Sequence, residues 1–330
     1  VKTRILILSD THGLKPQDSP GGPKGAKGTP PSGYRYPLPE ADVAIHCGDL
    51  TSNSNIPELE DTFSMLRQLS APLKLVIAGN HDLALDRNHW DSVVESLEAR
   101  GRIPLPVVEQ YKRCPVEFQR IIDAARQDGV IYLPDDGVYD FELGNGARLR
   151  VFASPMTPSY GAWAFQYPRG TYKFDIPAAA GIDVVVSHGP PRGVLDRASN
   201  GQYAGCDELF AAVCASRPQI HCFGHIHEAW GAELVTWKKP PPSDDKYNSA
   251  AAPLARSNAY GSGPEGKKAA KAKVARFYRD KCVPVDITSA GRLSLRPGEQ
   301  TLFVNAAIMN RYYRPANVPW LVDIDLPKAG

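Results

Sequence analysis

The chain has 330 residues, of which 42% are hydrophobic and 22% are charged, and its formal net charge is +2 at pH 7. This composition is typical of a soluble globular protein, and so small a net charge argues against a nucleic-acid or anionic-membrane partner. No apolar stretch approaches the roughly 20 residues that a membrane-spanning helix needs, and the N-terminus enters a strand-like run at once, so we expect neither a membrane segment nor a signal peptide.

The six cysteines are scattered along the chain, and none belongs to a CxxC pair. Such spacing is not typical of a zinc knuckle or of a dense disulfide framework. We therefore predict free thiols in a reducing compartment and a cytoplasmic location.

The first third of the chain alternates between strand and helix patterns. Residues 3–9, 42–47 and 73–78 are short apolar runs with β-branched residues, which predicts three buried strands. Pro57 suits the first turn of a helix, and apolar residues recur at helical spacing from there to residue 70. A strand, a helix and a strand in this order predict a βαβ unit with parallel pairing.

The remaining elements are predicted in the same way. Residues 88–99 and 115–128 have helical patterns, and 139–153 alternate about Gly144-Asn145-Gly146, which predicts a hairpin. Five further short runs are predicted strands, and they are 183–187, 219–223, 231–236, 301–305 and 320–324.

We expect one domain over residues 1–330, interrupted by loop insertions at 13–40, 90–135 and 238–276. The first is rich in Pro and Gly, which predicts a long surface loop. The third starts with a Lys-Lys-Pro-Pro-Pro run and continues small, polar and Lys-rich, which predicts disorder with its basic residues on a solvated face.

Five apolar runs end in residues of the types that bind metals. Because ligands of open α/β sheets bind outside the carboxyl ends of the strands, we expect these residues to meet at one edge. The five segments are Ile5 to His12, Val43 to Asp49, Leu73 to Asp82, Val184 to Gly189 and Ile220 to His227.

The candidate ligands are two carboxylates, one amide and four imidazoles. They are Asp10, His12, Asp49, Asn80, His188, His225 and His227. A single structural zinc ion needs only four ligands, so the set suits two divalent ions that share a bridging carboxylate. The nitrogen and oxygen donors favour Mn, Fe or Zn over Ca or Mg.

Spacing and glycines support this interpretation. Asp10 and His12 are two residues apart, so in an extended strand both can address one ion. His225 and His227 have the same spacing, but the chain is leaving its strand there, so they could reach different ions. Glycines lie beside the ligands, where they permit tight turns and close approach, and they are Gly48, Gly79, Gly189 and Gly224.

The motifs Asp-x-His, Gly-Asp, Gly-Asn-His-Asp, Ser-His-Gly and Gly-His-x-His occur in this order between residues 10 and 227. In this order they resemble the calcineurin-like metallophosphoesterase superfamily. Four further matches resemble its metallophosphoesterase-domain (MPPED) branch, the class III cyclic-nucleotide phosphodiesterase type; they are Ser187 to Pro191, Ala204 to Leu209, Gly224 to Glu228 and Asn305 to Ala307. The resemblance implies an α/β fold, a four-layer α/β/β/α sandwich of two mixed sheets with a dinuclear metal site at the sheet edge.

The resemblance also implies a role for each site residue. One metal ion would be held by Asp10, His12, Asp49 and His227. The other would be held by Asp49, Asn80, His188 and His225, with Asp49 as the bridge. His81 would face the substrate, where it stabilises phosphoryl oxygens or protonates the leaving group, and Asp82 would orient it.

The resulting hypothesis is a metal-dependent phosphoesterase for a small-molecule substrate, with phosphodiesters preferred to monoesters. Two ions about 3.5–4 Å apart lower the pKa of a bridging water to roughly 7, and the hydroxide attacks phosphorus in line. One alternative is a phosphomonoesterase, including a protein phosphatase. Another is a non-catalytic scaffold with the same fold. A nuclease would need a basic groove, which the net charge disfavours.

A few other residues have two interpretations. Arg192 could hold a phosphate with its planar guanidinium or form a surface ion pair. His46 and His221 lie inside apolar runs and are predicted to be core residues with a hydrogen-bond partner. Trp163, Phe165 and Tyr167 could stack on a base, but hydrophobic packing is the preferred interpretation.

Overall fold

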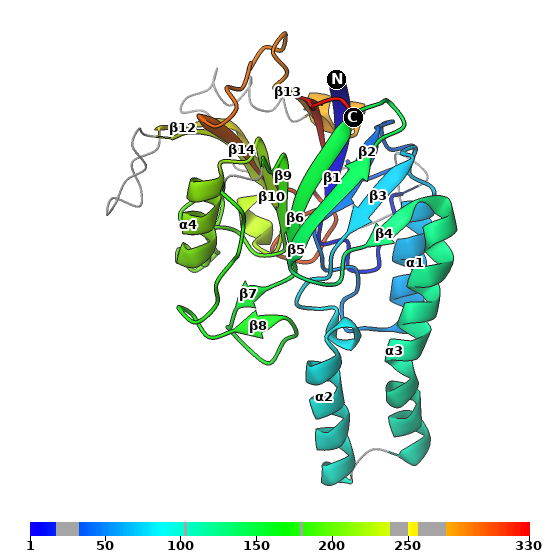
Figure 1. The fold of residues 1–330 in the computed structure, drawn as a ribbon. Coiled ribbons are helices and arrows are strands. Elements are labelled where there is room, and N and C mark those ends of the chain that lie inside the picture. The colour runs from blue at the N-terminus through cyan, green and yellow to red at the C-terminus, as the bar shows by residue number, and fades with distance from the viewer. Residues whose placement is uncertain (18–32, 102–103, 179–180, 238–249, 257–274) are drawn as a thin grey trace.

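The computed structural model describes residues 1–17, 33–101, 104–178, 181–237, 250–256 and 275–330. Within these residues, two mixed β-sheets stand face to face at the centre and helices cover their outer sides (Figure 1). A separate pair of short strands, β7 (Thr157–Pro158) and β8 (Gln166–Tyr167), lies beyond one end of the sheets.

The first sheet has six described strands in the order β13-β15-β1-β2-β3-β4. Their bounds are β1 Lys2–Leu8, β2 Val43–His46, β3 Leu73–Val76, β4 Val130–Tyr132, β13 Val283–Asp286 and β15 Trp320–Asp325. Strands β1 to β4 are parallel, and β15 pairs antiparallel with β1. The C-terminal strand therefore returns to lie beside the N-terminal one.

The second sheet has seven described strands in the order β12-β11-β14-β10-β9-β6-β5. Their bounds are β5 Gly137–Glu142, β6 Arg148–Ser154, β9 Val184–Ser187, β10 Ile220–Phe223, β11 Gly231–Thr236, β12 Ala250–Arg256 and β14 Gln300–Asn305. Strands β6, β9, β10 and β14 are parallel. The predicted hairpin about residues 144–146 is confirmed as the antiparallel β5–β6 pair.

Both faces of each sheet are covered, and strand β1 shows how the sequence achieves this. Ile5 and Ile7 pack into the apolar cluster between the sheets. Leu6 and Leu8 pack into a second cluster, under α1 and α3. Successive side chains of a strand point to opposite faces, so a strand buried on both sides is an uninterrupted apolar run.

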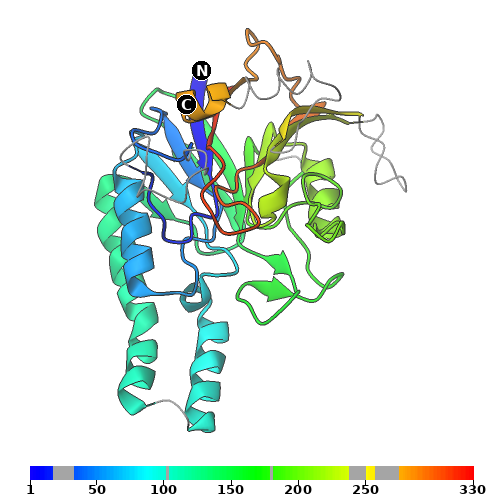
Figure 2. The same cartoon turned by 180° about the vertical axis from the view of Figure 1, so that it is seen from behind.

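Helices α1 (Ile56–Arg67) and α3 (Leu105–Ala125) cover the first sheet, and α4 (Asp207–Ser216) covers the second (Figures 1 and 2). A third cluster joins α4 to the second sheet through Leu209, Phe210 and Phe223. The predicted four-layer α/β/β/α sandwich of two mixed sheets is confirmed.

Helix α2 (Arg87–Arg100) runs beside the lower half of α3, and the two extend away from the sheets as a hairpin (Figure 1). Asp86 caps α2, because its side chain accepts a hydrogen bond from His89 N at 3.1 Å. Gly101, with a φ of 58°, ends the helix in the left-handed conformation. The predicted helix at 88–99 is confirmed.

The prediction for residues 90–135 needs correction, since this segment is mostly helical rather than a loop. Helix α3 begins at Leu105, ten residues before the predicted start at 115. Pro115 lies inside the helix, where it removes one backbone donor. The buried residues Val108 and Phe118 continue the apolar face on both sides of it, and their packing outweighs the local cost. Whether the segment is an insertion stays a prediction.

The other two predicted insertions are only partly described. Residues 18–32, 238–249 and 257–274 lie outside the described residues, so the predictions of a surface loop and of disorder are untested there. Two described parts differ from those predictions. Residues 250–256 form β12, which pairs antiparallel with β11. Tyr34 is fully buried against the first sheet and its helices.

The six cysteines are all free thiols, five of them buried and Cys214 half-buried, as predicted. None of the helices in the described part of the chain combines the length and the apolar character needed to cross a membrane.

The buried face of α3 yields a stability prediction. Phe118 is fully buried, whereas Val116, two residues away on the same helix, is 64% exposed. We expect Phe118→Ala to lower the free energy of unfolding by about 3–5 kcal/mol through lost burial and a residual cavity. Val116→Ala should change it by no more than about 0.5 kcal/mol. Urea unfolding of both variants tests the difference, and equal effects would contradict the observed face of α3.

Candidate metal centre

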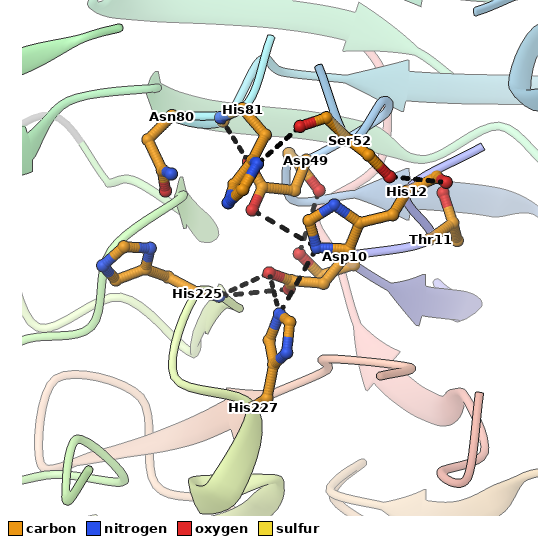
Figure 3. Close-up of polar contacts among 12 residues, drawn as sticks. Asp10, Thr11, His12, Asp49, Ser52, Asn80, His81, His225 and His227 are labelled. Atoms are coloured by element: carbon orange, nitrogen blue, oxygen red, sulfur yellow. Dashed lines mark hydrogen bonds and ion pairs between the residues drawn. The ribbon is translucent and has the colours of Figure 1, made fainter. Parts of the chain in front are cut away.

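The candidate ligands come from both sheets and meet at one edge. Asp10, Asp49 and Asn80 follow the parallel strands β1, β2 and β3 of the first sheet. His188 and His225 follow β9 and β10 of the second. The carboxyl ends of the two sheets are joined directly, because Ile308 N donates a hydrogen bond to Ser9 O at 2.8 Å. Figure 3 shows the resulting cluster.

A first group of ligand atoms is compact and buried. Asp10, His12, Asp49 and His227 each offer one donor atom, and these atoms all lie within 4.8 Å of one another. His227 Nε2 is 3.2 Å from Asp10 Oδ1. His12 Nε2 is 3.6 Å from Asp49 Oδ2 and 3.4 Å from His227 Nε2. These are the four residues that the resemblance placed around one metal ion.

A second group lies on the other side of Asp49. His188 Nε2 is 2.9 Å from Asn80 Oδ1 and 3.4 Å from Asp49 Oδ1. The ring centroids of His188 and His225 are 5.0 Å apart. Asp49 therefore presents Oδ2 to the first group and Oδ1 to the second, which is the arrangement of a bridging carboxylate.

Backbone carbonyls fix the orientation of three imidazoles in these groups. Nδ1 of His12 lies 3.1 Å from Thr51 O, Nδ1 of His188 lies 2.8 Å from Cys47 O, and Nδ1 of His227 lies 3.2 Å from Asn310 O. A carbonyl only accepts hydrogen bonds, so each Nδ1 carries the hydrogen and each Nε2 faces the cluster. This is the tautomer of a histidine that ligates metal through Nε2.

The first group consequently brings acceptor atoms together. With Nδ1 protonated, Nε2 of His12 and Nε2 of His227 are both lone-pair donors to a metal, yet they lie 3.4 Å apart among carboxylate oxygens. Lone pairs and negative charges at such separations repel one another unless a positive charge lies between them, either a proton such as the one His227 Nε2 shares with Asp10 or a metal ion. The donor set therefore fits a bound divalent metal ion.

The local charges keep the carboxylates in their ligand form. Burial alone would favour neutral carboxyls, but hydrogen bonding to His227 lowers the pKa of Asp10 to about 2. His188 likewise outweighs burial and holds the pKa of Asp49 well below its usual range. Burial lowers the pKa of His12 to about 4, against the pull of Asp49, so this imidazole is neutral.

The backbone at four candidate ligands lies in the left-handed region, which non-glycine residues seldom occupy. The φ angles are 54° at Asp10, 47° at His12, 54° at Asp49 and 66° at His225. Such residues cost about 1–3 kcal/mol each and persist only where the surroundings impose them. Here the loops after β1 and β2 are hydrogen-bonded to each other, with Asp10 N to Gly48 O at 2.9 Å and His12 N to Asp49 O at 3.0 Å.

Two of the predicted glycines are explained by close approach. A Cβ at Gly224 would overlap the Asp10 carboxylate and the Ser9 hydroxyl. A Cβ at Gly79 would overlap Asp49. At both positions a ligand packs directly on the backbone, so a side chain has no room.

His81 lies beside the cluster, but its predicted orientation by Asp82 is wrong. His81 Nδ1 donates to Ser52 O at 2.7 Å. Asp82 instead binds the strand-end loops: Oδ2 accepts from Leu50 N at 3.0 Å and Gly79 N at 2.8 Å. Its Oδ1 accepts from Thr51 N at 2.8 Å and Thr51 Oγ1 at 2.9 Å. Burial and then the nearby Asp49 raise the pKa of Asp82 to about 6.

The two predicted core histidines are buried and hydrogen-bonded, as expected. His46 Nε2 pairs with Thr11 Oγ1 at 2.9 Å, and His221 Nε2 pairs with Ser187 Oγ at 2.8 Å. Arg192 donates through Nη1 to Tyr203 O at 2.6 Å, and its guanidinium carbon lies 6.0 Å from the Tyr203 ring centroid. These contacts give no support to phosphate binding by Arg192.

Three aromatic residues, Tyr160, Trp163 and Tyr313, contact the site. No prediction was made for Tyr160 or Tyr313, and base stacking by Trp163 was the less favoured of its two interpretations. Tyr160 Oη accepts from Asn80 Nδ2 at 2.9 Å, and the Trp163 ring lies 4.2 Å from the His81 ring. Tyr313 lies 5.1 Å from the His12 ring and 5.0 Å from the His227 ring. The packing prediction holds for the buried Phe165 and Tyr167 but not for Trp163. No motif marked these loops.

Comparisons with known proteins agree with the geometry. The family model described as calcineurin-like phosphoesterase matches residues 3–229. The chain is 34% identical over 238 residues to a probable rhamnogalacturonate lyase C of Emericella nidulans, covering 71% of this chain and 18% of that protein. It is 31% identical over 235 residues to Metallophosphoesterase domain-containing protein 1 of Homo sapiens, covering 69% of this chain and 62% of that protein. The chain thus spans less than two thirds of either relative.

Among solved structures, a purple acid phosphatase from seeds of yellow lupin (Lupinus luteus) matches with a TM-score of 0.38 at 13% identity. The match covers 97% of this chain and 47% of that one. Similarity at this level carries no inference about function.

The shared carboxylate yields a prediction about metal content. We expect the wild-type chain to bind two divalent ions and Asp49→Asn to lose both, because the amide removes the charged bridge between the groups. His81→Ala, which alters no candidate ligand, should keep both ions. Elemental analysis after dialysis against Mn²⁺ measures the content. Loss of metal from His81→Ala would show that His81 is a ligand.

The contacts of Asp82 yield a second prediction. An asparagine offers one acceptor oxygen, so the donors now bound to one of the two carboxylate oxygens lose their partner. We expect Asp82→Asn to lower the free energy of unfolding by about 1–3 kcal/mol for each buried donor left unpaired. Asp175→Asn, where the carboxylate is 77% exposed, is the matched control. Equal unfolding midpoints of the two variants in urea would rule out the structural role.

Proposed function

Because this chain belongs to the calcineurin-like phosphoesterase family, we propose that it is a metal-dependent enzyme that hydrolyses phosphodiesters with two divalent ions. The family predicted from the motifs is confirmed, and the Homo sapiens relative carries the name of the predicted branch. The observation that carries the proposal is the pair of ligand groups that share Asp49, with one carboxylate oxygen facing each.

The donor set supports Mn, Fe or Zn as the bound ions, since it combines imidazoles with carboxylate and amide oxygens and includes no thiolate. Two such ions, when bound, act as Lewis acids and lower the pKa of water to about 7. Asp10, His12 and His227 would hold one ion. Asn80, His188 and His225 would hold the other, and Asp49 both.

His81 is the chain's own candidate for proton transfer. Its backbone N donates to Asp49 Oδ1 at 2.9 Å, and its ring lies 4.9 Å from the His12 ring, so it borders the ligands without belonging to them. Because Nδ1 is bound to the Ser52 carbonyl, Nε2 is the atom that can hold or deliver a proton at the leaving oxygen.

The surroundings of the cluster support diesters over monoesters. Tyr160 and Tyr313 are 56% and 54% exposed, and they line the approach to the ligand groups. Aromatic side chains favour contact with an ester substituent over contact with a second charged phosphoryl oxygen. A small-molecule phosphoester is the proposed substrate, and the free thiols support a cytoplasmic location for the reaction.

Hydrolysis of two model esters tests the proposal. Protein reloaded with Mn²⁺ should cleave bis-p-nitrophenyl phosphate faster than p-nitrophenyl phosphate, because the aromatic approach favours the second ester group. EDTA and Asp49→Asn should each abolish turnover. Faster cleavage of the monoester would favour a phosphomonoesterase. No turnover of either ester by protein shown to contain two ions would favour a non-catalytic scaffold.

A further inference from the structure

Within the described part of the chain, the His81 ring is held by a hydrogen bond from Nδ1 to Ser52 O. This bond sets the tautomer and the approximate orientation of the ring, and packing around the ring limits the rotation about Cβ–Cγ that remains. Proton delivery needs Nε2 within hydrogen-bond distance of the leaving oxygen, so the plane must be held as well. Asp82 does not hold it, because its oxygens accept from the loops after β2 and β3.

Trp163 packs closest to the His81 ring, and the Tyr313 ring lies farther away, at 6.2 Å. The ring centroid of Trp163 lies 4.2 Å from that of His81, and the two planes are inclined by 37°. The His12 ring approaches His81 edge-on, at 4.9 Å and 88°. Trp163 therefore lies against the His81 ring while His12 and the Ser52 carbonyl limit its movement in other directions. Close packing between flat rings is favourable beyond the area that it buries.

The loop that carries Trp163, residues 159–165, is tied to the chain on either side of His81. Ala164 N donates to Asn80 O at 3.1 Å, and Asn80 Nδ2 donates to Tyr160 Oη at 2.9 Å. Phe165 N donates to Asp86 Oδ2 at 2.9 Å. Trp163 is half-buried between these attachments. Its position relative to His81 is thus set by bonds to the neighbouring residues rather than by a free loop.

We propose that Trp163 is a positioning residue that holds the plane of the His81 imidazole for proton transfer to the leaving oxygen. The proposal rests on the proposed phosphoesterase function, in which His81 meets the leaving group. Trp163 itself contributes neither a metal ligand nor a proton. Substitution of Trp163 should therefore lower turnover only when His81 is present. The loss should be larger for leaving groups that depend more on protonation.

The kinetic test is a double-mutant cycle. General acid–base catalysis contributes about 10²–10⁴-fold, so we expect Trp163→Ala to lower kcat for a diester by about 10- to 100-fold with little change in KM. The loss of kcat should be larger for methyl phenyl phosphate, which expels phenol, than for methyl p-nitrophenyl phosphate, which expels p-nitrophenol. In a His81→Ala background, the same substitution should have almost no further effect.

Two further variants separate positioning from general packing. Trp163→Phe keeps a flat ring and should retain most activity, whereas Trp163→Leu keeps bulk without a flat face and should behave like Trp163→Ala. The comparison of Phe with Leu decides the case even where the alanine variant does not fold. Tyr111→Ala, which removes a 37% exposed ring on α3, is the control and should leave kcat unchanged.

An NMR measurement makes the test independent of turnover. The imidazole signals of His81, assigned by their absence in His81→Ala, should carry a clearly larger ring-current shift in the wild type and in Trp163→Phe than in Trp163→Leu, where only the His12 and Tyr313 rings remain nearby. Wild-type protein that cleaves no ester while showing this shift would refute the proposed function and leave the contact intact. Equal losses of kcat from Trp163→Ala with and without His81, or equal activity of Phe and Leu variants, would overturn the positioning role.

Discussion

The Asp49 carboxylate is the point on which the site depends. Oδ2 faces His12 and Oδ1 faces His188, so one side chain joins the two ligand groups. Its left-handed backbone, with a φ of 54°, aims the carboxylate between them. Gly79 packs against it because any side chain at that position would occupy the same space. The strain and the missing side chain are both consequences of bringing the acceptor groups close together.

The fold provides this convergence by facing two parallel sheet edges toward each other. β1, β2 and β3 deliver their ligands from one sheet, and β9 and β10 deliver theirs from the other. The bridge between Ser9 and Ala307 links the two edges, and Asp10 accepts bonds from His225 N at 3.0 and 3.1 Å. The ligand groups thus lie where the layers of the sandwich meet.

The support of the site was harder to predict than its ligands. Asp82 follows His81 in the chain, and adjacency suggested that it orients that ring, yet its carboxylate binds Leu50, Thr51 and Gly79. Trp163, which lies 82 residues after His81 in the chain, contacts the His81 ring instead. Such contacts form between loops that the fold brings together. Because these loops have neither periodicity nor a motif, no local sequence pattern predicts which residues will meet. The start of α3 was missed for a related reason, since packing of Phe118 overrides the local effect of Pro115.

The sequence by itself determined the elements and the ligand types. Uninterrupted apolar runs such as 5–8 specify strands buried on both faces, and the Asp, Asn and His residues that end them specify nitrogen and oxygen donors, because both signals are local. Only the tertiary structure decided the return of β15 beside β1 and the aromatic contacts of Tyr160, Trp163 and Tyr313. These depend on distances between segments far apart in the chain, which local patterns do not encode.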